Sequence, residues 1–234
     1  MDATDLCQRF ETLLGADADG RLTGATWLHV VRAAERASCF CHRDLAPDVA
    51  TRLSEIAQRE RGRQRDWPRD YADYLRVLAE VGTMVAVRAG PLYAAREPPA
   101  FEPQAIAIGA HNADLLLGGL DEWRPDVAAG LPMFAATQGG RAVSICATVK
   151  ATDVAHAAGV ETLPAYRGQG LAAHAVAAWG HAVQALGATP FYGTSFDNLA
   201  SQAVARRLGL QLLASEFSVE CDALPSRRRA DIDS

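Results

Sequence analysis

Lysine is almost absent from this chain of 234 residues, in which Lys150 is the single lysine and the other basic side chains are arginine. Acidic residues outnumber basic ones, 28 against 23, and the formal net charge is −5 at pH 7. This balance argues against a general binder of nucleic acid or of membrane surfaces, which needs positive charge. The arginine bias and the many alanines are a compositional association with GC-rich bacterial genomes, so we expect a bacterial source.

Long apolar runs are also missing. No stretch is long enough to span a bilayer. The acidic N-terminus, "MDATDLCQRFETLLGADADG", lacks the basic and apolar regions of a signal peptide. We therefore expect a cytoplasmic protein with no membrane partner.

Cysteine is scarce and scattered. The chain has five cysteines, and an odd, dispersed set argues against a disulfide framework. The segment "CFCH", with Cys39, Cys41 and His42, lacks the spacing and the second cluster of a zinc site. We expect buried or half-buried thiols and no metal.

The first 80 residues show mostly helical spacing of apolar side chains, and the texture changes after residue 82. The segment "TMVAVRAGPLYAARE" is typical of a strand, a turn and a second strand, and the proline-rich "REPPAFEP" at 96–103 is the best candidate boundary. Helical spacing recurs at 6–14, 27–31, 49–56 and 71–78. We expect a mainly helical region over 1–100 that ends in a strand pair, a second domain over 101–222 and a flexible tail over 223–234.

The second domain alternates strands and helices. Short apolar "AIAIG" precedes a helix candidate at 111–123, and "LPMFAAT" and "RAVSICATVK" flank Gln138-Gly139-Gly140 as a hairpin does. A strand, a long helix, "PFYGTS", the short helix "DNLASQAVARRLG" and a final strand "LQLLASEFSVE" follow. This order predicts an α/β fold with a mixed sheet.

One segment of this domain indicates a ligand. In "GVETLPAYRGQGLAAHAV", residues 159–176, a strand passes through Arg167-Gly168-Gln169-Gly170 into a helix that begins with Leu171 and Ala172. Backbone N–H groups at a helix start have no partner within the helix and favour an anion. Glycine lets the backbone approach a ligand closely because it carries no Cβ. The segment therefore predicts a phosphate cradle.

These residues resemble the GNAT superfamily of acyl-CoA N-acyltransferases. The family's Arg/Gln-x-x-Gly-x-Gly/Ala motif is matched by Arg167 to Ala172, and the strand and Asn-led helix that follow it are matched by "FYGTSFDNLASQAVARRLGL". The resemblance covers about half of the chain. It implies a mixed, mostly antiparallel central sheet flanked by helices, here preceded by a mainly helical N-terminal region.

The resemblance also implies acetyl-CoA as co-substrate and assigns its binding residues. The turn from Arg167 to Ala172 would hold the pyrophosphate. Free backbone groups of Val160, Glu161 and Thr162 would bond the pantetheine arm, where the fourth strand splays from the fifth at a bulge. Asn198 matches the family's amide on the cofactor arm. A plain helix cap is an equally good interpretation of Asn198.

The implied reaction transfers an acetyl group directly to a primary amine of a small molecule or a peptide. Because the amine is protonated near neutral pH, a base must remove a proton. Glu161 and His156 are the candidates, with a hydrogen-bonded structural acid and a solvent-facing loop residue as the alternatives. The family often has a tyrosine in the last helix that protonates the leaving thiolate, whereas this chain has Ala205. Tyr166 and Tyr192 are the nearest tyrosines in the sequence, and neither matches the motif.

Two other functions remain open at this stage. Ala205 favours a non-catalytic acyl-CoA-binding or regulatory module. The arginines at 59–69 and 226–229 suggest nucleic-acid binding weakly, and we expect no nucleic-acid partner. The sequence names no acceptor amine, and it leaves a homodimer open.

Overall fold

The computed structural model describes residues 2–60, 66–95 and 101–223, and the chain forms two compact units. The first unit combines residues 1–13 with 91–213, and the second combines 14–90 with 214–234. Strands β3 (Gly82–Ala94) and β9 (Gln211–Ala223) run through both units. The expected boundary at 96–103 lies partly, and the expected tail almost wholly, outside the described residues, so the division at 100 and 222 remains a prediction.

The first unit is built on a mixed sheet. Within it the hydrogen-bonded strand order is β3-β8-β7-β6-β5-β4. The pairs β3–β8, β4–β5, β5–β6 and β6–β7 are antiparallel, and the pair β7–β8 is parallel. The remaining strands are β4 (Ile106–Ala107), β5 (Met133–Gln138), β6 (Arg141–Thr152), β7 (Ala155–Thr162) and β8 (Thr189–Gly193). A mostly antiparallel sheet flanked by helices is therefore confirmed.

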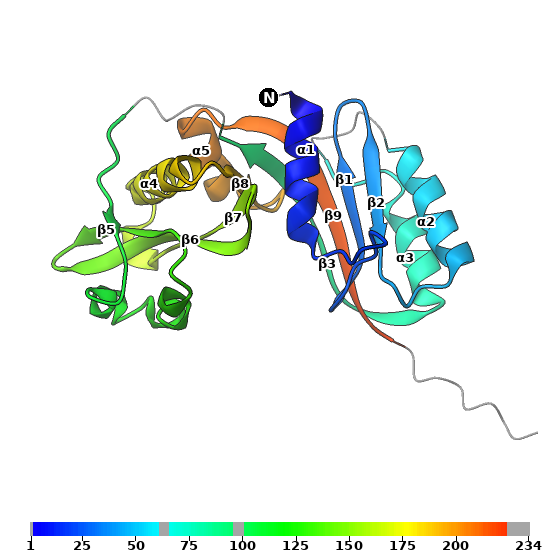
Figure 1. Ribbon diagram of the computed structural model, residues 1–234, viewed down its shortest axis with the longest axis horizontal. Helices are drawn as coiled ribbons and strands as arrows, with labels where there is room; N and C mark the ends of the chain where they lie inside the picture. The colour runs from blue at the N-terminus through cyan, green and yellow to red at the C-terminus, as the bar shows by residue number, and fades with distance from the viewer. Residues whose placement is uncertain (1, 61–65, 96–100, 224–234) are drawn as a thin grey trace, which may run out of the picture. The chain divides into compact units, whose positions relative to one another are not determined.

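Helices cover this sheet in two layers. Helices α4 (Leu171–Ala185) and α5 (Leu199–Arg207) lie on one face, and the short green turns between β4 and β5 lie on the other (Figure 1). Those turns are η2 (Ala113–Leu116), η3 (Asp121–Trp123) and η4 (Pro125–Ala129). Both faces of β6 are consequently buried from Ala142 to Thr148. The unit also holds α1 (Ala3–Glu11), the first two residues of η1 (Thr12–Leu14), and η5 (Pro164–Tyr166).

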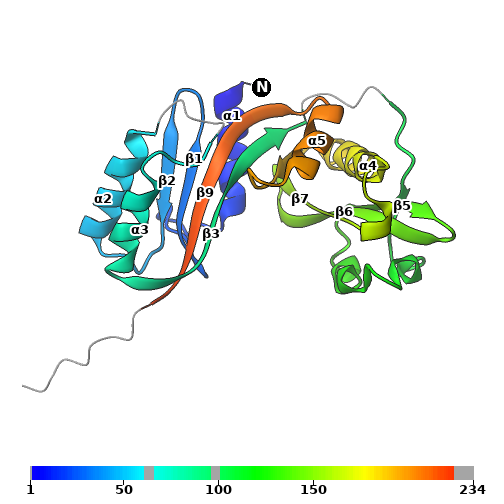
Figure 2. The ribbon, with the colours of Figure 1, turned by 180° about the vertical axis from the view of Figure 1, so that it is seen from behind.

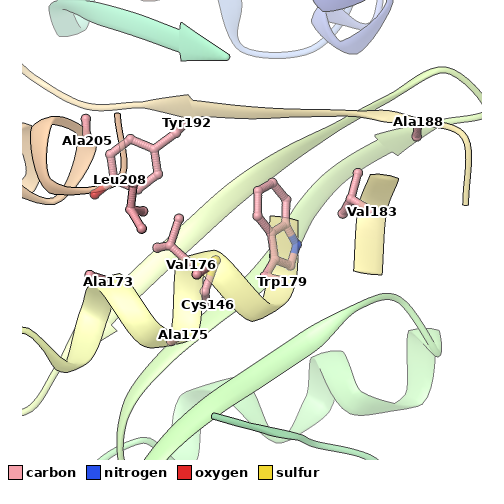
Figure 3. Packing of buried hydrophobic residues seen from close by; sticks show 11 residues of the cluster. Cys146, Ala173, Ala175, Val176, Trp179, Val183, Ala188, Tyr192, Ala205 and Leu208 are labelled. Atoms are coloured by element: carbon pink, nitrogen blue, oxygen red, sulfur yellow. The ribbon is translucent and has the colours of Figure 1, made fainter. Parts of the chain in front are cut away.

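One of the two cores lies under α4. Val176, Trp179 and Val183 of α4 pack with Cys146 of β6 and Tyr192 of β8 (Figure 3). Full burial of one such apolar side chain contributes about 1.5–3 kcal/mol relative to exposure. Cys146 is fully buried, so its thiol has the packing role rather than a place in an open cleft.

Most elements of this unit agree with the sequence pattern, but the expected helix at 111–123 is wrong. The structure has the separate turns η2 and η3 there, because Gly118 and Gly119 interrupt the segment with φ of +87° and +143°. Only glycine adopts such angles readily. The hairpin, the long helix, the following strand and the Asn-led helix lie where the sequence predicts them.

The second unit has a smaller sheet with two helices. Its strand order is β2-β1-β9-β3, with β1 (Thr26–Arg32) antiparallel to β2 (Ala37–Cys41) and to β9. Figure 2 shows α2 (Pro47–Gln58) and α3 (Tyr71–Ala79) side by side on one face of this sheet. Each helix buries one stripe of side chains, such as Leu53 and Ile56 of α2.

Two expectations in this part of the chain are wrong. The helical spacing around 27–31 belongs to β1, a strand so fully buried that its apolar residues show no period-two alternation. The strand, turn and strand expected from residue 83 form the single strand β3, which continues through Gly90 and Pro91. In the described part of the first hundred residues, the α-helices are α1, α2 and α3, and strands β1, β2 and β3 lie between and after them.

Within the described ranges, no helix is long and apolar enough to cross a membrane.

Candidate active site

The motif loop turns sharply between η5 and α4. Gly168 and Gly170 have φ of +76° and +78°, in the left-handed region that glycine tolerates without strain. Gly170 is the N-cap of α4, and no side chain caps this helix start. The glycines of the motif are therefore required by the backbone path of the loop.

The start of α4 presents several open donors. Among the described residues, no acceptor bonds the backbone N–H groups from Gly168 to Ala172, and the first bonded group is Ala173, which donates to the Gly170 carbonyl at 3.1 Å. These N–H groups carry the positive end of the helix dipole. The backbone geometry at the predicted phosphate cradle therefore leaves these donors open within the described residues.

The polar side chains of the motif hold the loop in place. Arg167 donates from Nε to the carbonyl of Thr162, at 3.2 Å, and so ties the loop to the end of β7. Gln169 accepts a bond from Gln138 at 3.3 Å. Arg167 forms no ion pair within the part of the chain that the structure describes. Its exposed guanidinium retains donors for an anion.

A second arginine, which the sequence did not single out, lies at the cradle. A Cβ added to Gly170 would collide with the guanidinium of Arg207, from the last turn of α5. Arg207 stacks over Phe101, whose ring centroid is 5.9 Å from Cζ, and Phe101 in turn packs edge-on against His174. Burial and the charge of Arg207 lower the pKa of His174. Within the described residues, no carboxylate pairs with Arg207, so a positive charge lies directly over the open helix start.

Strand β7 leaves one edge partly unpaired. Its parallel pairing with β8 covers Ala155 to Ala157 and stops there, although β7 continues to Thr162. The other edge stays paired with β6 along the whole strand. The resemblance implied a bulge where the fourth strand splays from the fifth. The register shift between β6 and β7 lies in β6, at Val149. The segment containing Val160, Glu161 and Thr162 therefore has backbone groups without a strand partner on the β8 side.

Glu161 lies on the face of β7 opposite α4, where Trp123 covers it. The indole of Trp123 donates from Nε1 to Oε2 of Glu161 at 2.6 Å. A Cβ at Gly159 would come within 2.8 Å of the same indole, so glycine at 159 allows the ring to lie across the strand. Glu161 is half-buried, and its second carboxylate oxygen has no partner among the described residues.

The turn that carries Trp123 is fixed by Asp121. The Asp121 carboxylate accepts the N–H groups of Gly118 and Gly119, at 3.0 and 2.8 Å. The bond from Gly119 is the main cause of the lowered pKa of Asp121. Trp123 was inside a predicted helix, and its bond to Glu161 depends on these non-helical turns, so the sequence carried no signal for it.

His156 lies in the protein interior rather than in a solvent-facing loop. It is 5% exposed, and its Nδ1 is 3.1 Å from Oγ1 of Thr148, to which Trp179 also donates, at 2.9 Å. Burial lowers the pKa of His156. Because alternate strand residues face opposite sides, His156 and Glu161 point to different faces of β7. The structure does not bring the two candidate bases together.

Asn198 caps its own helix. Its Oδ1 accepts the N–H of Ser201 at 3.0 Å, which satisfies one orphan donor at the start of α5. The side chain is exposed, and within the described residues its Nδ2 has no acceptor. Capping by Oδ1 thus leaves the amide nitrogen for another ligand.

Comparison with known proteins assigns one segment of the chain to a family. The family described as GNAT acetyltransferase matches residues 130–216. This segment is a GNAT acetyltransferase domain. No curated protein is a significant match to the chain.

Two solved structures support the fold of this segment, and a third is similar over a smaller part of the chain. A GNAT-family protein from Novosphingobium aromaticivorans shares 18% identity and a TM-score of 0.51 over 61% of this chain and 67% of its own. An acetyltransferase of the GNAT family from Colwellia psychrerythraea shares 11% identity and a TM-score of 0.50 over 95% of this chain and 98% of its own. A third protein, from Salmonella typhimurium, was solved with its cofactor acetyl-CoA and aligns at 14% identity with a TM-score of 0.37, over 56% of this chain and 99% of its own.

The matched GNAT segment contains the cradle, β7 and both arginines, whereas Trp123 and Phe101 lie before it. Ala205, which stands where the family often has tyrosine, is fully buried against Tyr192 and Leu208. No group of three or more His, Cys, Asp or Glu side chains in the described ranges is arranged to hold a metal ion.

Proposed function

We propose that this chain is an N-acetyltransferase that moves an acetyl group from acetyl-CoA to a primary amine of a small molecule or peptide. The observation that carries the proposal is the open start of α4. Its N–H groups from Gly168 to Ala172 lack acceptors among the described residues, and Arg207 adds a positive charge beside them.

The residues present fit coenzyme A. The cradle and Arg207 match a pyrophosphate, which needs several N–H donors and a cation. The unpaired edge of β7 from Ala158 to Thr162 matches the amides of a pantetheine arm, which bind as an added strand does. Asn198 offers its Nδ2 to the same arm. The bound co-substrate supplies the activated acetyl thioester.

Glu161 is our candidate base. Its carboxylate is held by Trp123 through one oxygen, and the other oxygen is free to accept a proton from an incoming ammonium, directly or through water. A backbone N–H of β7 near Val160 would polarise the thioester carbonyl and stabilise the oxyanion that forms on attack. We propose Glu161 ahead of His156, because His156 lies within a buried Thr148–Trp179 chain.

A non-catalytic acyl-CoA-binding module is the second candidate. Two observations favour it, namely Ala205 in place of a tyrosine and the tight bond between Trp123 and Glu161. The two functions share the cradle and differ in Glu161, so a variant of Glu161 separates them.

Calorimetry with acetyl-CoA and a thiol-release assay with a panel of primary amines test the proposal together. We expect wild type to bind acetyl-CoA and to release thiol only with an amine. Glu161→Gln keeps the Trp123 bond and should lower kcat about 100-fold or more with an unchanged Kd for acetyl-CoA. Binding without amine-dependent release would support the module instead, and no binding would contradict both functions.

A further inference from the structure

The fully buried Ala205 leaves α5 without a phenol, and β8 supplies one at the same place. Figure 3 shows the ring of Tyr192 projecting from β8 toward α5, beside Ala205 and Leu208. Tyr192 is 3% exposed, so its ring fills part of the space next to Ala205. The phenol of Tyr192, from β8, therefore lies next to Ala205, the position on α5 where a tyrosine is absent.

The hydroxyl of Tyr192 is bonded to the first turn of α5. Its oxygen lies 2.6 Å from Oγ of Ser201 and 3.4 Å from the Ser201 carbonyl. Ser201 is one helical turn before Ala205, and side chains four residues apart share a helix face. Asn198, three residues earlier, caps this turn by accepting the Ser201 N–H. The two hydroxyls thus form a pair at the start of α5, on the helix face that carries Ala205.

This pair is located beside the opening between β7 and β8. The last β7–β8 partners are Ala157 and Phe191, so Tyr192 is the first residue of β8 beyond the pairing. Its ring packs in the same cluster as Val160, on the α4 side of the sheet. Ser201 is half-buried, whereas Tyr192 is buried.

We propose that Ser201, ordered by Tyr192, donates the hydrogen bond that stabilises the leaving thiolate, in place of the tyrosine that is absent at Ala205. The inference rests on the proposed function. Ser201 is the catalytic residue in this scheme, and Tyr192 is a positioning residue.

The step balances without a further reactant. As the tetrahedral species collapses, the C–S bond breaks with its electron pair on sulfur, and the new C–N bond stays in the amide product. The thiolate accepts a hydrogen bond from Ser201 and takes from solvent the proton that the amine loses through Glu161. Burial raises the pKa of Tyr192 to about 12, so the phenol stays neutral and remains a donor to Ser201.

The test measures the thiol of bound coenzyme A by its thiolate absorbance as a function of pH, which needs no turnover. Ser201→Ala and Tyr192→Phe each remove one hydroxyl and keep most of the packing. A charge-assisted hydrogen bond is worth about 1.5–3 kcal/mol, so we expect the acid dissociation constant of the bound thiol to fall about tenfold or more in each variant. Both variants should also lower kcat without a change in KM for acetyl-CoA.

Tyr93→Phe is the matched control, because its ring also contacts Tyr192, with centroids 6.5 Å apart, yet it is not the ring bonded to Ser201. This variant should titrate like wild type. The double variant Tyr192→Ala/Ala205→Tyr moves the phenol from the strand to the helix. It should restore the wild-type acid dissociation constant of the bound thiol.

The outcomes separate the two proposals. Equal titration of the bound thiol in wild type, Ser201→Ala and Tyr192→Phe would overturn this inference and leave the proposed function intact. Failure of wild type to bind coenzyme A would overturn both. Circular dichroism and thermal unfolding of each variant establish that a change in titration does not come from loss of fold.

Discussion

The two helices on the α4 side of the sheet begin in opposite ways. Helix α5 is closed by its own sequence, since Asn198 accepts the N–H of Ser201. Helix α4 begins at Gly170 with no side-chain cap and with open N–H groups back to Gly168. The last turn of α5 then places Arg207 over the open start of α4.

We propose that this difference separates a structural helix start from a binding one. An uncapped start forfeits roughly 1 kcal/mol that a capping side chain would contribute. Within the described residues, α5 is capped, α4 is open, and no carboxylate pairs with Arg207 beside it, so these donors are available to another group. We infer that the group is the pyrophosphate of acetyl-CoA.

The largest effect is expected from closing the open start. Ala172→Glu places a carboxylate at the second position of α4, where it favours the helix dipole by about 0.3–1 kcal/mol and competes with a bound anion. We expect the affinity for acetyl-CoA to fall about 100-fold, because the new carboxylate repels the phosphates and competes with them for the open N–H groups. Thermal stability should not fall. Calorimetry and thermal unfolding measure the two quantities.

Ala200→Glu is the matched control, because Ala200 is the second residue of α5 and is exposed. The same charge at the capped start should leave acetyl-CoA binding within about twofold, since the dipole effect is confined to one helix end. Equal losses in both variants would show that the start of α4 is not special.

Removing the cation beside the open start should have the next largest effect. Arg207→Gln deletes the guanidinium over Gly170, and one charged hydrogen bond to phosphate corresponds to about a tenfold loss of acetyl-CoA affinity. Arg206→Gln removes an equal charge from the same helix turn and is exposed. If the two variants bind acetyl-CoA alike, Arg207 acts only through net charge. Titration with coenzyme A that lacks its 3′-phosphate shows which phosphate Arg207 contacts.

The turn into α4 was predictable from the sequence because its cause is local. Gly168 and Gly170 need positive φ, and the helix that follows supplies the open donors, so the residues themselves encode the turn. The hairpin and α5 were predictable for the same reason. By contrast, β1 has no alternation to detect because both of its faces are buried, and the glycine pair at 118–119 breaks a segment whose leucine spacing is helical.

The rest of the candidate site depends on contacts between distant segments. Trp123 meets Glu161 across 38 positions of sequence, and Arg207 reaches Gly170 from the end of another helix. No spacing rule links such residues. His156 also lacked a local signal for its burial, since its partners Thr148 and Trp179 come from β6 and α4.

A smaller effect is expected from opening the closed start. Asn198→Ala removes the cap of α5 and should lower the free energy of unfolding by about 1 kcal/mol. Asn198→Asp keeps the capping oxygen and loses the amide nitrogen, so it should retain stability and lose any bond to the cofactor arm. Urea unfolding and calorimetry of both variants separate capping from binding. Equal stability of Asn198→Ala and wild type would mean that the cap contributes nothing.

The smallest effect concerns His156, in the interior beneath α4. Lowering the pH should reduce stability through this residue without changing acetyl-CoA binding at the open start of α4. Burial holds the pKa of His156 below its unfolded value of about 6.5, so the stability from neutral His156 is present above pH 6.5 and is lost as the pH falls through the folded pKa. Between pH 6.5 and about 5, the free energy of unfolding should fall in both proteins. We expect the fall to be larger in wild type than in His156→Gln by a few tenths of a kcal/mol, because only wild type has this histidine to take up a proton on unfolding. Urea unfolding at several pH values, followed by tryptophan fluorescence, gives this difference. If stability depends on pH in the same way in both proteins, the titrating group is not His156. If wild type also loses acetyl-CoA binding over this pH range, the interior is coupled to the start of α4.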